Sequence, residues 1–167
     1  MTIPQELFLS AVSHSASLFA ASSPKEVLLL HHNDADGLSS GAILNRAFER
    51  KGLRVRRYCL ETPYPEVTAR LFGDPDLATH TTIVLVDFGS GMLPKLCELN
   101  DHRNEVFVLD HHAIAPVDDP SIHLVNCLSH GIASDPDCSA SAIAAVFATA
   151  LEGSNADLAA LGVLGAV

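Results

Sequence analysis

The sequence has few of the aromatic and basic residues through which proteins bind nucleic acid over a broad surface. It has no tryptophan, two tyrosines and seven phenylalanines, so stacking on bases would fall to very few side chains. Ten lysines and arginines stand against twenty acidic residues, which gives a formal net charge of −10. Nucleic-acid binding through bulk positive charge is therefore excluded.

Long hydrophobic runs and targeting signals are also missing. No apolar run reaches the length that spans a membrane, and the N-terminal segment lacks the basic start and apolar core of a secretory signal. We therefore expect a cytoplasmic protein that does not bind a membrane. The cysteines show no C-x-x-C spacing and lie in or beside apolar segments. Small buried hydrophobic residues are expected, rather than disulfides or a zinc site, at Cys59, Cys97, Cys127 and Cys138.

The basic residues are unevenly distributed, since six of the ten fall within twelve positions. They are Arg46, Arg50, Lys51, Arg54, Arg56 and Arg57. We interpret this cluster as a solvated helix end and turn. The alternative is a patch that follows a phosphate backbone.

Strand-like and helix-like segments alternate along the chain. Strands are expected at residues 25–32, 54–60, 82–86, 105–109 and 123–125. Helices are expected at 5–21, 38–51, 65–72, 93–99 and 142–151, with a capping box at 154–157 that starts a last helix. This alternation predicts one α/β domain, a doubly wound, mainly parallel sheet with helices on both faces.

Three apolar runs each end in metal-binding side chains. They lead into His31-His32-Asn33-Asp34-Ala35-Asp36-Gly37, Asp87-Phe88-Gly89 and Asp110-His111-His112. Such runs are typical of buried parallel strands, whose carboxyl ends form the ligand-binding edge of an α/β sheet. We therefore expect these side chains to share one site at that edge.

Carboxylates gathered at one edge repel each other unless cations neutralise them. Carboxylate oxygens favour Mg²⁺ or Mn²⁺, and imidazole shifts the preference towards Mn²⁺. Two such ions about 3.5–4 Å apart can activate water and stabilise both reacting oxygens of a phosphoryl transfer. A single strand-end aspartate usually caps the next helix, but three such ends together favour a two-metal phosphoesterase site.

These motifs, in this order and spacing, resemble those of the DHH phosphoesterase superfamily. The first motif is most similar to that of the RecJ-like and archaeal-type nuclease branch, and the resemblance spans residues 27–167. It implies that two Mn²⁺ or Mg²⁺ ions are bound by Asp34, Asp36, Asp87, Asp110 and His111.

Further roles are predicted for histidines and one asparagine. His112 and His32 are expected to act in catalysis by contacting phosphate and stabilising developing charge. His32 should lie on the same side of its strand as Asp34, because strand side chains alternate. The resemblance also implies substrate-phosphate contacts by Asn126 and His130, with a merely solvated loop histidine as the alternative for the latter.

The chain departs from the superfamily pattern at two places. Leu30 stands four residues before the first aspartate, where pyrophosphatase-like members have a histidine, so inorganic pyrophosphatase activity is disfavoured. The superfamily pattern continues to a fourth-motif aspartate after an apolar segment that resembles residues 161–167. We therefore expect residues 1–167 to be a catalytic domain truncated before that motif and without the superfamily's C-terminal substrate-binding domain.

The resemblance implies a RecJ-like exonuclease that acts on single-stranded DNA or RNA through two-metal hydrolysis. One alternative is a phosphatase for nano-RNA, cyclic dinucleotides or nucleoside bisphosphates. Another is a replication or repair scaffold of the same superfamily that has no catalytic activity. The expected partners are single-stranded nucleic acid or a short oligonucleotide, together with a replication or repair protein.

Overall fold

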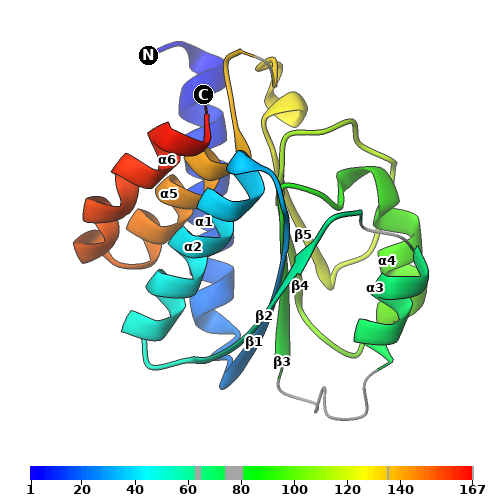
Figure 1. Cartoon of the computed structure of the whole chain (residues 1–167). Helices are drawn as coiled ribbons and strands as arrows, with labels where there is room; N and C mark the ends of the chain where they lie inside the picture. The colour runs from blue at the N-terminus through cyan, green and yellow to red at the C-terminus, as the bar shows by residue number, and fades with distance from the viewer. Residues whose placement is uncertain (63–64, 74–80, 135, 167) are drawn as a thin grey trace.

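The computed structural model describes residues 1–62, 65–73, 81–134 and 136–166 (Figure 1). Its centre is a five-stranded sheet with the strand order β2-β1-β3-β4-β5, in which all neighbouring strands are parallel. The strands are β1 (Glu26–His32), β2 (Arg54–Leu60), β3 (Thr81–Val86), β4 (Val106–Asp110) and β5 (Ile122–Asn126). The predicted doubly wound α/β fold is confirmed.

Helices cover both faces of this sheet (Figure 1). One face carries α1 (Ile3–Ala21), α2 (Ala35–Arg50), α5 (Ala140–Leu151) and α6 (Ala159–Gly165). The other face carries α3 (Pro65–Phe72) and α4 (Leu93–Asn100). None of the described helices has both the length and the apolar character needed to cross a membrane.

Each face of the sheet has its own hydrophobic core. Because strand side chains alternate, β1 contributes Leu29 to the core under α1, α2 and α5, and Leu30 to the core under α3 and α4. In the larger core, Phe19 stacks on Phe48 with ring centres 4.8 Å apart and meets Phe107 edge-on at 5.4 Å. These packed cores hold the strand ends in fixed positions.

The helix starts differ from the sequence expectations in informative ways. Helix α2 begins at Ala35 rather than residue 38, because the Asp34 carboxylate caps it by accepting from Gly37 N at 2.8 Å. The capping box expected at 154–157 is wrong. Asn155 there is fully buried and donates to Ala148 O at the end of α5, and a 3₁₀ turn, η3 (Gly153–Leu158), precedes α6.

Two further expectations needed correction. His130, considered above as a loop histidine, ends a 3₁₀ turn, η2 (Cys127–His130), which is capped by the Asn126 side chain. Of the four cysteines, Cys127 is buried, whereas Cys59 is exposed because it lies on β2 at the edge of the sheet. All four are free thiols, and the other two are partly exposed.

Candidate metal centre

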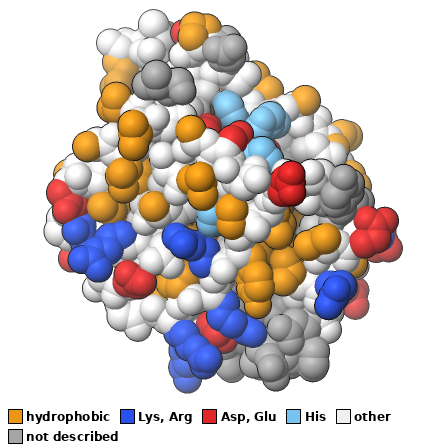
Figure 2. Space-filling view, in the orientation of Figure 1, with side chains coloured by type: hydrophobic (Ala, Val, Ile, Leu, Met, Phe, Trp, Pro, Cys, Tyr) orange, Lys and Arg blue, Asp and Glu red, His pale blue; other side chains and the backbone are white. Residues whose placement is uncertain are grey.

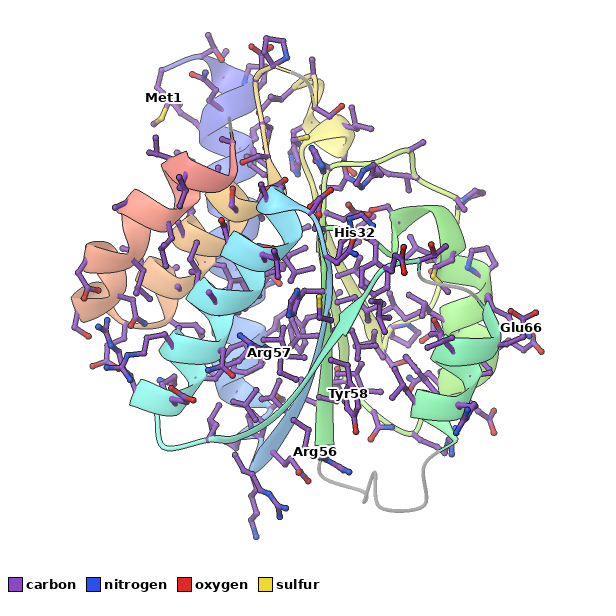
Figure 3. All side chains as sticks on the ribbon, in the orientation of Figure 1. Met1, His32, Arg56, Arg57, Tyr58 and Glu66 are labelled. Carbon is purple, nitrogen blue, oxygen red and sulfur yellow. The ribbon has the colours of Figure 1, made fainter. Side chains whose placement is uncertain are left out.

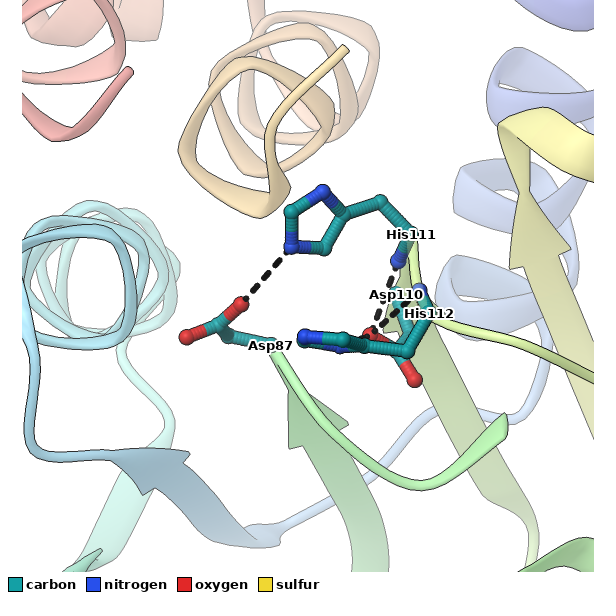
Figure 4. A group of neighbouring side chains, drawn as sticks. All are labelled: Asp87, Asp110, His111 and His112. Atoms are coloured by element: carbon teal, nitrogen blue, oxygen red, sulfur yellow. Dashed lines mark hydrogen bonds and ion pairs between the residues drawn. The ribbon is translucent and has the colours of Figure 1, made fainter. Parts of the chain in front are cut away.

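The carboxyl ends of β1, β3 and β4 bring acidic and imidazole side chains together, and Figure 4 shows those at the ends of β3 and β4. They form two groups, within each of which the possible ligand atoms lie within 4.8 Å of one another. One group consists of Asp87, Asp110, His111 and His112, and the other of His32, Asp34 and Asp87. Asp87 belongs to both groups and therefore lies at the middle of the centre.

Asp87 is held in an unfavourable state. Its backbone has a φ of 67°, a left-handed conformation that costs a non-glycine residue about 1–3 kcal/mol. Its side chain is 2% exposed, and burial raises its pKa to about 6, helped by the nearby Asp36 and Asp34 carboxylates. Oδ2 accepts no hydrogen bond from a described residue, and the facing Asp34 carboxylate has no proton to donate when ionised. A buried oxygen without a donor suits a bound cation.

His111 is oriented for metal binding by a backbone carbonyl. Its Nδ1 donates to Cys138 O at 3.1 Å, and because a carbonyl can only accept, the proton is assigned to Nδ1. In the neutral ring Nε2 then presents a lone pair towards Asp87 Oδ1, 3.3 Å away. A carbonyl that fixes the imidazole in this way is typical of metal-binding histidines. Without metal, the hydrogen bond to Asp87 raises the pKa of His111 to about 9, against the effect of burial.

Asp110 is fully buried, and both of its carboxylate oxygens accept hydrogen bonds. Oδ1 accepts from His112 Nδ1 at 2.7 Å and from the backbone of His111 and His112, while Oδ2 accepts from Ser90 N at 2.9 Å. Burial acts to raise the pKa of Asp110, but the hydrogen bonds from His112 and Ser90 lower it overall. Asp110 therefore orients the His112 ring, which is 58% exposed and has a raised pKa because of this contact.

His32 faces the centre from β1. Its Nε2 donates to Glu61 O at 3.0 Å, so Nδ1 of the neutral ring directs a lone pair towards Asp34 Oδ2 at 2.9 Å and Asp87 Oδ2 at 3.8 Å. Burial opposes ionisation of Asp34, but the hydrogen bond from Gly37 N–H lowers its pKa overall, helped by His32 when Nδ1 of that ring carries a proton. An imidazole lone pair beside two carboxylates is an arrangement that a cation would bridge, which favours a ligand role for His32.

Asp36 borders the two groups without belonging to either. Its Oδ2 accepts from Ala140 N at 2.8 Å and its Oδ1 from Ser141 N at 2.7 Å, so the carboxylate binds the N-terminus of α5. The same Oδ2 lies 3.7 Å from His111 Nε2. Asp36 thus ties α2 to α5 beside the centre, and its role as a metal ligand stays a prediction.

The two side chains predicted to contact phosphate are both engaged with other parts of the protein. Asn126 is 1% exposed; its Nδ2 donates to Ser90 Oγ at 2.8 Å and His112 O at 2.9 Å, and its Oδ1 accepts from Leu128 N. Asn126 therefore supports the backbone behind the centre. His130 packs its ring against Phe8 of α1, with 5.6 Å between ring centres.

Sequence reasoning missed the groups that hold the ligands in place. Ser90 begins a 3₁₀ turn, η1 (Ser90–Met92), and acts on Asp110 through its backbone N–H. Cys138 acts through its carbonyl, and the start of α5 acts through its N–H groups. One signal was present in Gly37, where a Cβ atom would come within 2.5 Å of His32 O, so only glycine lets α2 start this close to β1.

Comparisons with known proteins relate both the sequence and the fold to one family. The family model described as "DHH family, N-terminal domain" matches residues 26–165. An exonuclease RecJ structure bound to manganese is 25% identical with a TM-score of 0.70, and the match covers 91% of this chain and 42% of RecJ. RecJ from Thermus thermophilus, solved with Mn²⁺, is 23% identical with a TM-score of 0.70, covering 91% of this chain and 23% of RecJ.

CDC45 from Entamoeba histolytica shares the fold at 18% identity and a TM-score of 0.59, covering 96% of this chain and 32% of CDC45. No curated protein sequence matches the chain significantly. By the coverages given above, the chain spans less than half the length of either RecJ structure. The matched family model covers most of the sequence, and it includes every residue of the two ligand groups. The chain therefore belongs to the DHH family, in which it corresponds to the N-terminal domain.

Proposed function

We propose that this domain hydrolyses phosphodiester bonds at the ends of single-stranded nucleic acid and depends on Mn²⁺ or Mg²⁺. The observation that carries the proposal is the buried Asp87 carboxylate, which is shared by two ligand groups and has one oxygen without a donor. The manganese in the similar RecJ structures favours Mn²⁺. Two ions would be held with Asp87 between them, one beside His32 and Asp34 and one beside His111.

Divalent ions held in this way supply Lewis-acid activation of water and neutralise charge on phosphoryl oxygens. The protein's own groups do the rest. Cys138 O keeps the His111 proton on Nδ1, and Asp110 holds the exposed His112 ring by its Nδ1. The raised pKa of His112 favours the protonated ring, which would donate a hydrogen bond to a phosphate oxygen and stabilise negative charge that develops there.

The substrate class rests on the likeness to exonuclease RecJ. Single-stranded DNA or RNA is the proposed substrate, and nano-RNA, cyclic dinucleotides and nucleoside bisphosphates are the enzymatic alternatives. We place this activity in the cytoplasm, with a replication or repair protein as partner. The ligand set would be the five residues that the family resemblance implied, joined by His32.

A replication scaffold without catalytic activity is the second candidate, favoured by the structural likeness to CDC45. The two proposals differ in what they require of the centre. A scaffold needs no bound cation, so its carboxylates could remain protonated or solvated without loss of function. A phosphodiesterase needs cation binding and loses activity with it.

The test is calorimetric titration of the domain with Mn²⁺, combined with hydrolysis of bis(p-nitrophenyl) phosphate. We expect Mn²⁺ binding and slow hydrolysis by the wild type, and loss of both in the double variant Asp34→Ala, Asp36→Ala. The exposed Asp118→Ala controls for removal of a carboxylate elsewhere. Equal Mn²⁺ affinity in the double variant would refute the site, and Mn²⁺ binding with no hydrolysis of any diester would favour the scaffold.

A further inference from the structure

The edge strand β2 leads to the metal centre. It pairs only with β1 among the described strands, so its other long edge has no strand partner. Because β2 runs parallel to β1, it ends at the same carboxyl edge as the centre. The chain there contacts the centre directly, since Glu61 O accepts from His32 Nε2 at 3.0 Å.

The basic residues on and near β2 differ in whether a carboxylate neutralises them. Arg54 and Arg56 both approach Glu26, at 3.5 and 2.9 Å, and Arg50 binds Asp157 at 2.7 Å. Arg57 is exposed and, within the ranges that the structure describes, has neither an ion-pair partner nor a hydrogen-bond acceptor for its side chain. Its charge therefore remains available to an anion.

An aromatic ring follows immediately in the sequence. Tyr58, the next residue of β2, is 39% exposed. Because consecutive side chains of a strand point to opposite faces of the sheet, Tyr58 and Arg57 lie on opposite faces beside the same open edge. Figure 3 shows these two side chains on either side of β2, with His32 above them towards the end of the strands. Single-stranded nucleic acid carries phosphates on one side and bases on the other. The Arg57 cation on one face and the Tyr58 ring on the other match that arrangement.

The charge distribution favours the same path. The chain has a net charge of −10, so most of its surface repels a polyanion. In the view of Figure 2, lysine and arginine side chains lie across the face formed by β2 and α2, below the histidines of the centre. Most of these cations are paired with carboxylates, so Arg57 is the charge on this face that a phosphate backbone would meet on its way to the metal centre.

We propose that single-stranded nucleic acid lies along the open edge of β2, with a phosphate on Arg57 and a base stacked on Tyr58. This deepens the function proposed above and rests on it for the substrate class. Arg57 is four residues before Glu61, about 13 Å at roughly 3.3 Å per residue. It therefore contacts a phosphate remote from the scissile bond, and its effect depends on substrate length.

The test measures binding of fluorescein-labelled dT12 and rU12 by anisotropy with Mn²⁺, over a series of salt concentrations. Arg57→Glu should weaken binding at least about fivefold and lower the salt slope by about one, as expected for a lost phosphate contact. Tyr58→Ala should weaken binding by a similar factor, and Tyr58→Phe should restore it because the ring is retained. Lys95→Glu on α4 makes the same charge change away from β2 and should leave binding unchanged.

Hydrolysis of bis(p-nitrophenyl) phosphate separates this proposal from the function on which it rests. Arg57→Glu should leave that reaction unchanged, because the small diester does not extend from the centre as far as Arg57. Oligonucleotide binding that Arg57→Glu and Tyr58→Ala leave intact would overturn the β2 path, even if the domain hydrolyses diesters. Binding that depends on both residues in a domain without diesterase activity would support the path and refute the catalytic proposal.

Discussion

Each edge of the sheet holds a buried aspartate beside a histidine, and the two aspartates differ in their hydrogen bonds. At the amino edge, Asp119 accepts from Cys97 Sγ, from the backbone and hydroxyl of Ser121, and from His102 Nδ1, at 2.7–3.1 Å. At the carboxyl edge, Asp87 faces His111 through one oxygen and leaves the other without a donor. The hydrogen bonds from Cys97 and Ser121 lower the pKa of Asp119, whereas burial raises that of Asp87 to about 6.

This difference distinguishes a carboxylate whose hydrogen bonds are all made within the protein from one that suits a bound ligand. Backbone strain does not separate them, since Asp87 has a positive φ of 67° and the loop near Asp119 has two such residues, Asp101 and His102, at 46° and 54°. A neighbouring histidine does not separate them either. What distinguishes the two aspartates is the buried Oδ2 of Asp87, which has no hydrogen-bond donor. Its desolvation is unfavourable, and only a ligand or a proton can offset that cost.

The largest effect is expected for Asp87→Asn, which removes the charge and keeps the shape. Mn²⁺ affinity should fall at least about 100-fold and diester hydrolysis should fall to background, since ligand loss exceeds the 10–100-fold effects of supporting residues. The thermal midpoint of the metal-free domain should change little, because removal of a buried charge offsets the loss of the contact with His111. A collapsed midpoint with normal hydrolysis would instead make Asp87 a structural residue like Asp119.

Asn126→Ala tests whether hydrogen-bonded support contributes to the centre. Loss of the bonds to Ser90 and His112 should reduce Mn²⁺ affinity or turnover about tenfold, with KM for a small diester unchanged. The matched control is Asn45→Ala at a partly exposed position, which breaks a bond to Glu49 on the surface of α2. An increase in KM alone would restore the sequence-based interpretation of Asn126 as a phosphate contact.

Asp119→Ala should produce the opposite pattern to Asp87→Asn. It leaves the Ser121 and Cys97 donors without an acceptor, so the thermal midpoint should fall by several degrees. Mn²⁺ affinity should not change, because the cluster lies at the opposite edge of the sheet. Scanning calorimetry and Mn²⁺ titration of one sample measure both quantities, and a loss of affinity would show that the two edges are coupled.

The smallest effect is a pH dependence of the metal-free domain. The pKa of His111 is raised from 6.5 to about 9, so its stabilising contribution is complete below pH 6.5 and is lost as pH rises towards 9. The pKa of Asp87 is raised from 3.8 to about 6, so its contribution is likewise lost as pH rises through that interval. The thermal midpoint should therefore fall between pH 6.5 and 9.

Two changes to the sample should each remove part or all of that decline with pH. In Asp87→Asn the decline should be smaller, because Asp87 is the main cause of the raised pKa of His111. With Mn²⁺ present the trend should reverse, since metal binding needs a neutral imidazole and ionised carboxylates. Thermal scans at matched ionic strength measure the trend. A midpoint that is flat across this range in metal-free wild type would contradict the assigned contact between His111 and Asp87.

The sequence was sufficient to predict the sheet and the positions where its chemistry gathers. Asp87 and Asp110 each follow an apolar strand, and this pattern specifies both the strand and the polar end. The structure places both at the carboxyl edge, as expected. The family resemblance rested on these same motifs, and the family model confirms it.

The sequence was not sufficient for the groups that orient those side chains. The Cys138 carbonyl and the N–H groups at the start of α5 belong to the backbone, and every non-proline residue has them. Burial of Asn126 depends on η2 folding over β5, which residue type does not reveal. Cys59 was expected to be buried because strand order, and hence the edge position of β2, cannot be deduced from its own neighbours.

The register between β3 and β4 has a consequence for folding fidelity. Val86 pairs with Leu109, which brings the next residues, Asp87 and Asp110, to the same edge. A slip of one residue would turn every side chain of a strand to the opposite face and disperse the ligand groups. Mn²⁺ at 100 times its dissociation constant would stabilise the correctly registered state by about 2.7 kcal/mol and leave slipped states unaffected. Bound Mn²⁺ would thereby favour the native register of β3 and β4 over slipped registers.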